Sequence, residues 1–179
     1  MLYDFIRNKT FGLFATPSTI GILGQIIIAY FWGEQDKRIG NFCIVIPTIC
    51  IGFMWFGTVM FAERNAIAQM SRDGRGKSPE AVALSEAEWA NPGYRAATNF
   101  MCVVWGVGFI LQATVIALVA FLAPQSAFNA TQIGLGVGVP VALGTWNYFY
   151  VQELMKKKKR AEQGKVGESA EPLQPIIAN

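Results

Sequence analysis

Long runs of uncharged, mostly apolar residues alternate with short charged segments along this chain. The longest run extends from Ala96 to Gln152 without a single Asp, Glu, Lys or Arg. A membrane-spanning helix needs about 20 mostly apolar residues, so this run has room for two helices and a connection. The polar stretch from Pro124 to Thr131 marks that connection. We therefore expect a hairpin of two antiparallel spans at about residues 97–122 and 132–152.

Two earlier runs, Phe11 to Trp32 and Ile39 to Ala62, are also uncharged. The first is longer than the apolar region of a signal peptide, which has about 7–15 residues, and it lacks a small-residue cleavage site at its end. The second contains Pro47, which would kink a spanning helix. The pattern predicts an all-α integral membrane protein with four transmembrane helices in one domain, residues 1–152, whose first two spans are 11–32 and 39–62.

Polar residues fill the segment 63–95 and the segment after Gln152. Within the first, residues 71–79 are rich in Ser and Gly and predict a flexible turn. Ser85 and Glu88 then have the spacing of a capping box, which predicts a short amphipathic helix that Pro92 would end. After Gln152 a basic run leads into a polar tail with Gly and Pro, and we expect residues 153–179 to be a basic and then disordered cytoplasmic tail.

Positive charge is distributed unevenly between the predicted loops. Thirteen of the 15 Lys and Arg residues fall in residues 1–10, 63–95 and 153–179, and the other two lie in the connection between the first two spans. Because positively charged loops stay in the cytoplasm, both termini and the loop 63–95 should be cytoplasmic. The loop between the third and fourth spans should then face outward.

The composition narrows the classes of function. Hydrophobic residues make up 53% of the chain and charged residues 15%, well below the quarter that is typical of soluble domains. Histidine is absent, which removes the commonest general base and metal ligand near neutral pH. The three cysteines lie in apolar runs without a metal-binding spacing. We expect no enzyme, no metal and no cofactor.

The predicted spans carry amides in place of ionisable groups. Asn99, Gln112 and Asn147 are the intramembrane polar candidates, and an amide in lipid usually forms an interhelical hydrogen bond worth about 1 kcal/mol or less. An alternative is a small oligomeric transporter or channel whose polar path runs near Gln112 and Asn147. In that case the Gly- and Pro-containing stretch 134–140 would be kinked or locally unwound.

Glycines form a second group of candidates, because a residue without a side chain lets two helices approach closely. Gly106 and Gly108 follow Trp105 in the third span, and Gly134 and Gly138 form a GxxxG motif in the fourth. We interpret all five as helix-packing residues. The contact they make is either within the chain or with a second membrane protein.

A basic run directly follows the fourth span. Cations at this position attract anionic lipid headgroups with about 1 kcal/mol per residue. Nucleic acid is not an expected partner, because no aromatic platform accompanies the run. The residues are Lys156, Lys157, Lys158, Lys159 and Arg160.

The order of Trp, Pro and Gly residues in the second half resembles a known family. Trp89 is followed by Pro-Gly-Tyr-Arg95, by Val-Val-Trp-Gly-Val-Gly-Phe109 and by Ala-Phe-Leu-Ala-Pro-Gln125. This order is similar to the C-terminal half of a family of small, uncharacterised bacterial inner-membrane proteins and, more distantly, to the intracellular septation protein A group. The resemblance implies a membrane-organising protein of the bacterial inner membrane without a catalytic site. Gln112 stands where related proteins carry an acidic residue.

Together these patterns predict a non-enzymatic membrane scaffold or an accessory subunit of a larger membrane complex, related through the resemblance to the cell envelope or septation. The expected partners are membrane lipids and either other integral membrane proteins or a second copy of the chain.

Overall fold

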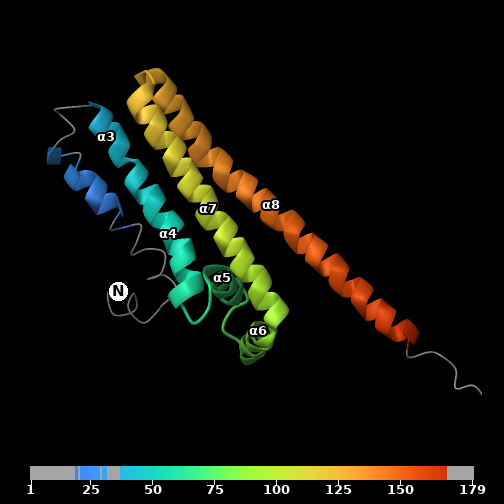
Figure 1. Cartoon of the computed structure of the whole chain (residues 1–179). Coiled ribbons are helices and arrows are strands. Elements are labelled where there is room, and N and C mark those ends of the chain that lie inside the picture. Colours follow the sequence, from blue (N-terminus) through green and yellow to red (C-terminus); the bar gives the residue numbers. More distant parts are fainter. Residues whose placement is uncertain (1–18, 20, 29, 32–36, 169–179) are drawn as a thin grey trace, which may run out of the picture. The chain divides into compact units, whose positions relative to one another are not determined.

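The computed structural model describes residue 19 and residues 21–28, 30–31 and 37–168. Half of the span expected at residues 11–32 therefore lies outside the described part, although residues 21–28 are helical. The remaining elements are all α-helices, shown in Figure 1: α3 (Lys37–Cys43), α4 (Val45–Phe61), α5 (Ala66–Gly74), α6 (Pro79–Ala90), α7 (Pro92–Leu122) and α8 (Gln125–Glu168).

Among the described residues, three segments are long and apolar enough to cross a membrane. They are Arg38–Phe61, Pro92–Leu122 and Gln125–Arg160, and they coincide with the second, third and fourth predicted spans. The fold is therefore all-helical, and these three segments indicate a multi-pass membrane protein.

The first of these segments is broken near Pro47. Helix α3 ends at Cys43 and α4 begins at Val45, with a tighter turn between them in which the Ile44 amide donates to the Asn41 carbonyl at 3.3 Å. Pro47 has no amide hydrogen to bond the carbonyl four residues earlier, which is that of Cys43. The proline thus accounts for the position of the break.

The connection between the last two helices is shorter than predicted. Helix α7 ends at Leu122 and α8 begins at Gln125, so residues 125–131 form the first turns of α8 and not a loop. The Phe128 amide closes the first turn by donating to the Pro124 carbonyl at 3.1 Å. The polar composition of these residues had suggested a loop, but their amides bond along the helix, as in the contact from Gln125 to Asn129 at 3.0 Å.

Helix α8 is also longer than the fourth span that was predicted. It is helical through Pro140 and reaches Glu168, so the stretch 134–140 is not unwound. Residues 153–168, the start of the tail that was expected to be basic and then disordered, are helical, and residues 169–179 lie outside the described part. Lys, Glu, Leu, Met and Ala are strong helix formers, and they extend a helix that the apolar span has already nucleated.

The polar segment between α4 and α7 contains two helices where one was expected. Asn65 and Ser78 cap the N-termini of α5 and α6 by accepting hydrogen bonds from the amides of Ala68 and Ala81. Ser85, which had been interpreted as the cap, lies inside α6. The Ser78–Pro79 pair is the better start signal, because proline is favoured at the first position of a helix.

The chain divides into two compact units, residues 1–143 and 144–179. In the first unit α4 packs along α7 with two clusters of buried side chains between them. Gly52 and Gly106 permit the close approach, because a Cβ at Gly52 would lie 3.3 Å from the Gly106 carbonyl oxygen. The start of α8 joins this core through Phe128, which is packed among Ala113, Ile116 and Ala120 of α7.

Candidate functional site

A buried polar cluster lies where α4, α5 and α7 meet. Asn65 is only 1% exposed; its carboxamide nitrogen donates to Thr98 Oγ1 and to Asn99 Oδ1, both at 2.8 Å. The Asn65 oxygen accepts from the Ala68 amide at 2.9 Å. One side chain therefore caps α5 and binds two successive residues of α7.

Thr58 extends this cluster into α4. Its hydroxyl donates to the Trp55 carbonyl at 2.9 Å and accepts from the Ala66 amide at 3.2 Å. The accepted bond satisfies one of the first amides of α5, which have no partner within the helix. Hydrogen bonds of this kind let a polar cluster be buried without the cost of unpaired donors.

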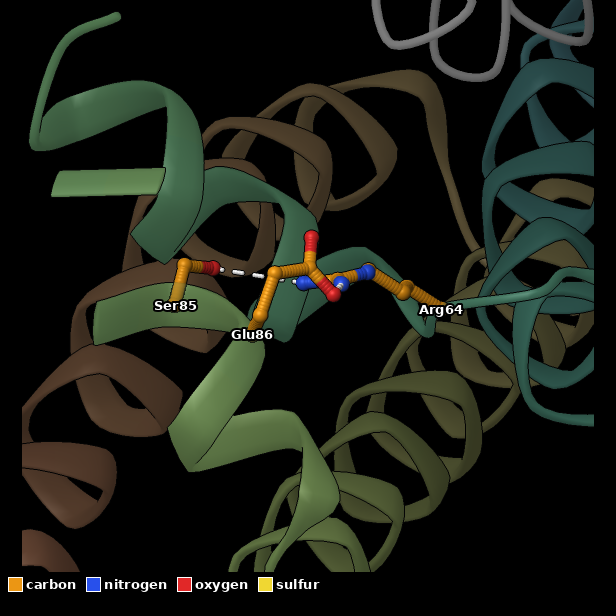
Figure 2. Close-up of polar contacts among 3 residues, drawn as sticks. All are labelled: Arg64, Ser85 and Glu86. Carbon is orange, nitrogen blue, oxygen red and sulfur yellow. Dashed lines mark hydrogen bonds and ion pairs between the residues drawn. The ribbon is translucent and has the colours of Figure 1, made fainter. Parts of the chain in front are cut away.

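Arg64 links the end of α4 to α6. Its side chain is only 9% exposed; one guanidinium nitrogen donates to Ser85 Oγ at 3.2 Å, and the other forms an ion pair with the Glu86 carboxylate. Figure 2 shows the arginine reaching across to these two neighbouring residues of α6. The guanidinium carbon also lies 5.7 Å from the centre of the Trp89 ring, within the range of a cation–π contact.

A second ion pair joins the residue that follows α5 to α6. Arg75 donates to the Glu88 carboxylate at 2.6 Å, and about a third of each side chain is exposed. The hydrogen bond to Glu88 raises the pKa of Arg75 above its ordinary value, so the arginine keeps its charge at any pH of interest. These two arginines neutralise two of the three glutamates of α6.

The aromatic and glycine candidates of α7 take part in packing. Trp105 lies 5.2 Å from Trp55 of α4 between ring centres. A Cβ at Gly106 would lie 2.8 Å from the Phe56 ring, and one at Gly108 would lie 2.8 Å from a methyl group of Leu143 in α8. The two glycines thus face different neighbours, although they are separated by a single residue.

The glycine candidates of α8 have a different environment. A Cβ added at Gly134 or Gly138 would meet no atom of the described structure within 4 Å. Both residues are exposed, as are Ala130 and Ala142, so small residues recur at every fourth position from 130 to 142. The GxxxG motif therefore lies on a face of α8 that nothing in the described structure covers.

The three intramembrane amides differ in their hydrogen bonding. Asn99 accepts from Asn65, as described above. Gln112 is 7% exposed on α7, and its carboxamide oxygen has no hydrogen-bond partner among the described residues. Asn147, which belongs to the second unit, likewise has an oxygen without such a partner.

Another amide cluster lies near the connection between α7 and α8. Asn41 of α3 donates to the Gln125 oxygen at 2.9 Å, and Gln125 in turn donates to Asn129 at 3.0 Å. These contacts are exposed, whereas Asn65 is buried.

The basic residues Lys156 to Arg160 are exposed on α8, and Glu153 lies 3.7 Å from Lys156.

The structure reveals residues that sequence reasoning missed, above all Arg64, Asn65 and Thr98. A signal for Asn65 was present, because asparagine before an alanine-rich helical segment is a typical N-cap. Nothing in the sequence indicated that its other hydrogen bonds would reach α7. Among the described residues no group of three or more His, Cys, Asp or Glu side chains could hold a metal ion.

No protein-family model matches the chain, and no curated protein or solved structure matches it either. The resemblance to small bacterial inner-membrane proteins and to the septation group stays a prediction from the sequence.

Proposed function

We propose that this chain acts by binding, as a non-enzymatic scaffold or accessory subunit of a membrane protein complex. The observation that carries the proposal is the uncovered small-residue face of α8, formed by Ala130, Gly134, Gly138 and Ala142. Small residues at every fourth position allow the backbone of another helix to approach closely in lipid. A face of this kind packs poorly against flexible acyl chains but well against a helix.

The direction in which this face points supports a contact with a partner. Successive residues of a helix are about 100° apart, which puts Ala130 and Gly134 about 160° and 120° around α8 from Phe128, Gly138 about 80° from it and Ala142 about 40° from it. Phe128 and Leu143 are two of the residues of α8 that contact α7. The part of the small-residue face at Ala130 and Gly134 thus points away from α7, and a Cβ at Gly134 or Gly138 meets no atom within 4 Å. These open positions are available to a second membrane protein or to another copy of this chain.

The surroundings of the face also favour packing over chemistry. The apolar stretch from Ala96 to Gln152 has no Asp, Glu, Lys, Arg or His, and these side chains are the usual carriers of proton or ion transport within a membrane. Helix association is the remaining use of this surface that its residues support.

Membrane lipids are the second proposed partner. Five successive cations, Lys156 to Arg160, cover one full turn of α8 and a little more, so they present positive charge in every direction around the helix. We place this end of α8, with both termini, on the cytoplasmic side of a bacterial inner membrane. Reporter fusions at Gly74 and Ala127 should report opposite sides, and the same side for both would contradict this topology.

The contact surface can be tested by two substitutions of the same kind. Gly138→Leu fills the small-residue face, whereas Gly136→Leu places the same side chain at another open position, about 200° around the helix. Each tagged variant is extracted from native membranes in a mild detergent and cross-linked. We expect the unmodified chain and Gly136→Leu to give one defined complex larger than the monomer, and Gly138→Leu to lose most of it.

Two results would contradict the proposal. One is a monodisperse monomer without a co-purified protein for the unmodified chain. The other is an equal loss of the complex in both leucine variants, which would show that the small-residue face has no particular role.

A further inference from the structure

Helix α6 is held in place by few apolar contacts. Ser85 is its only buried residue, and no residue of α6 is among the described members of either cluster of buried hydrophobic side chains or packs against one. Helix α5 differs in this respect, because Ala66 and Ile67 take part in the second cluster. Segments with little buried apolar contact open locally at a low cost in free energy. Polar contacts therefore account for most of the attachment of α6.

Arg64 makes the first of these polar contacts, and all of its described side-chain partners lie on α6. It donates to Ser85 Oγ at 3.2 Å, pairs with the Glu86 carboxylate and lies 5.7 Å from the centre of the Trp89 ring. Figure 2 shows the first two of these contacts. The Arg64 side chain is nearly buried, whereas that of Glu86 is 53% exposed. Water and dissolved ions therefore reach this ion pair from the side of the glutamate.

The second polar contact is the ion pair between Arg75 and Glu88. Its nitrogen and oxygen atoms are 2.6 Å apart, and about a third of each side chain is exposed. Ion pairs that solvent can reach are weakened by salt, because dissolved ions screen the charges. Both ion pairs of α6 are thus sensitive to the ionic strength of the solution.

The connections at both ends of α6 allow it to move. Gly76, in the turn before α6, has a φ of 87°, a left-handed conformation that glycine adopts readily. A Cβ at Gly74 or Gly76 would meet no atom of the described structure within 4 Å, so this turn is not packed against its surroundings. At the other end Asn91 alone separates α6 from α7. Its side chain caps α7 by accepting from the amides of Gly93 and Tyr94, a cap that does not depend on α6.

We propose that α6 is an electrostatic latch. It is closed when Glu86 and Glu88 bind Arg64 and Arg75, and it opens as a unit when salt weakens these two ion pairs. Opening leaves the Arg64 guanidinium without its three partners on α6 and so makes it accessible to other anions. The proposal requires neither a membrane contact of α6 nor a protein partner, so it is independent of the proposed function.

Hydrogen exchange of the full-length chain in mild detergent tests the latch. An isolated helix of 12 residues is barely stable in water, so α6 should unfold once it is detached, and its amide hydrogens should then exchange together. Raising sodium chloride from about 0.05 M to about 0.5 M shortens the range of electrostatic interactions about threefold. We expect the amides of α6 to exchange severalfold faster at the higher salt concentration, all by a similar factor, and those of α7 to be unaffected.

Two variants of the same kind separate the ion pair from a general effect of charge. Glu86→Gln removes the carboxylate that pairs with Arg64. Glu63→Gln removes the charge of an exposed glutamate that forms no ion pair among the described residues. At low salt Glu86→Gln should accelerate exchange in α6 severalfold and reduce its response to salt, whereas Glu63→Gln should behave as the unmodified chain does.

Three other results would overturn the proposal. If salt left exchange in α6 of the unmodified chain unchanged, contacts other than ion pairs would hold this helix. An equal acceleration in α6 and α7 would show that salt acts on the whole fold. Equal exchange in Glu86→Gln and Glu63→Gln would show that the pair with Arg64 does not close the latch. The salt series uses the unmodified chain, so it tests the latch even if a variant fails to fold.

Discussion

Helix α7 and the first part of α8 are both apolar, but the chain covers them very differently. Eight residues of α7 are buried, from Thr98 to Ala120, whereas in residues 125–143 of α8 only Phe128 is. The glycines differ in the same way, since a Cβ would strike a neighbour at Gly106 but nothing at Gly138. Glycine therefore permits close contact within the chain in α7, whereas in α8 it leaves an open surface.

The difference teaches that hydrophobicity alone does not decide packing in a membrane. Lipid tails are as apolar as leucine, so an apolar helix has no solvent-driven need to be covered. Close side-chain packing and the hydrogen bonds around Asn65 hold α4, α5 and α7 together. The described part of α8 forms few contacts of either kind.

The largest effect should come from Asn65. In Asn65→Ala the α5 cap is lost, at about 1 kcal/mol, and buried groups of α7 lose their partner, at about 1–3 kcal/mol. We expect a total loss of about 3 kcal/mol in the free energy of unfolding, measured by titration with a denaturing detergent in mixed micelles. Asn129→Ala removes an exposed amide and should change it by less than about 0.5 kcal/mol. An equal loss in the free energy of unfolding in both variants would contradict the central role of the polar cluster around Asn65.

Alanine at glycine should have opposite effects in the two helices. Gly106→Ala forces its Cβ against the Phe56 ring, and overpacking of this kind costs about 1–3 kcal/mol. Gly138→Ala meets no neighbour and should stabilise the helix by about 0.5–1 kcal/mol, since alanine favours helix more than glycine does. The same unfolding titration measures both. If the free energy of unfolding changed in the same direction in both variants, the distinction between a covered glycine in α7 and an open glycine in α8 would be contradicted.

Loss of Arg64 should loosen α6 without unfolding the chain. Arg64→Ala removes a nearly buried arginine with its hydrogen bond and its ion pair, which together contribute about 1.5 kcal/mol. Since 1.4 kcal/mol corresponds to a factor of ten, amide hydrogens of α6 should exchange about tenfold faster. Arg72→Ala, in a half-exposed position of α5, is the control and should leave this exchange unchanged. Unchanged exchange in Arg64→Ala would contradict the proposed link.

The smallest effect is expected for Arg75. Its pair with Glu88 is partly exposed, and such pairs contribute about 0.2–1 kcal/mol and weaken in salt. Arg75→Ala should therefore accelerate exchange in α6 less than Arg64→Ala does, and the difference from the unmodified chain should shrink in high salt. If Arg75→Ala accelerated exchange in α6 as much as Arg64→Ala does, the difference in burial would not explain a difference in strength between the two ion pairs.

The sequence predicted the three segments that are long and apolar enough to cross a membrane, 38–61, 92–122 and 125–160, because long uncharged runs are visible in it directly. It was less successful at their ends. The capping pattern at Ser85 and Glu88 was chosen, and Ser78–Pro79 was assigned to a turn. The polar residues 125–131 were expected to be a loop, and the helix was not expected to continue to Glu168. Local composition cannot show that a helix already formed by an apolar span will continue through polar residues.

Only part of the candidate site could be predicted from the sequence. Trp105, Gly106 and Gly108 were singled out because of their residue types, and the structure places each of them against a neighbour. Arg64 and Thr98 were overlooked because each is ordinary in its local context, and the local signal of Asn65 indicates only a helix cap. Their hydrogen bonds join residues 21 to 34 positions apart in the chain, a relation that no local pattern contains.

The sequence by itself determined that the chain is helical and apolar enough to cross a membrane, because that property depends only on run length and the absence of charge. Only the tertiary structure decided which glycines are filled by neighbours, which amides are paired and which face of α8 stays open. These depend on the direction of each side chain and on what lies across from it, so the same GxxxG spacing is compatible with a covered and an uncovered helix.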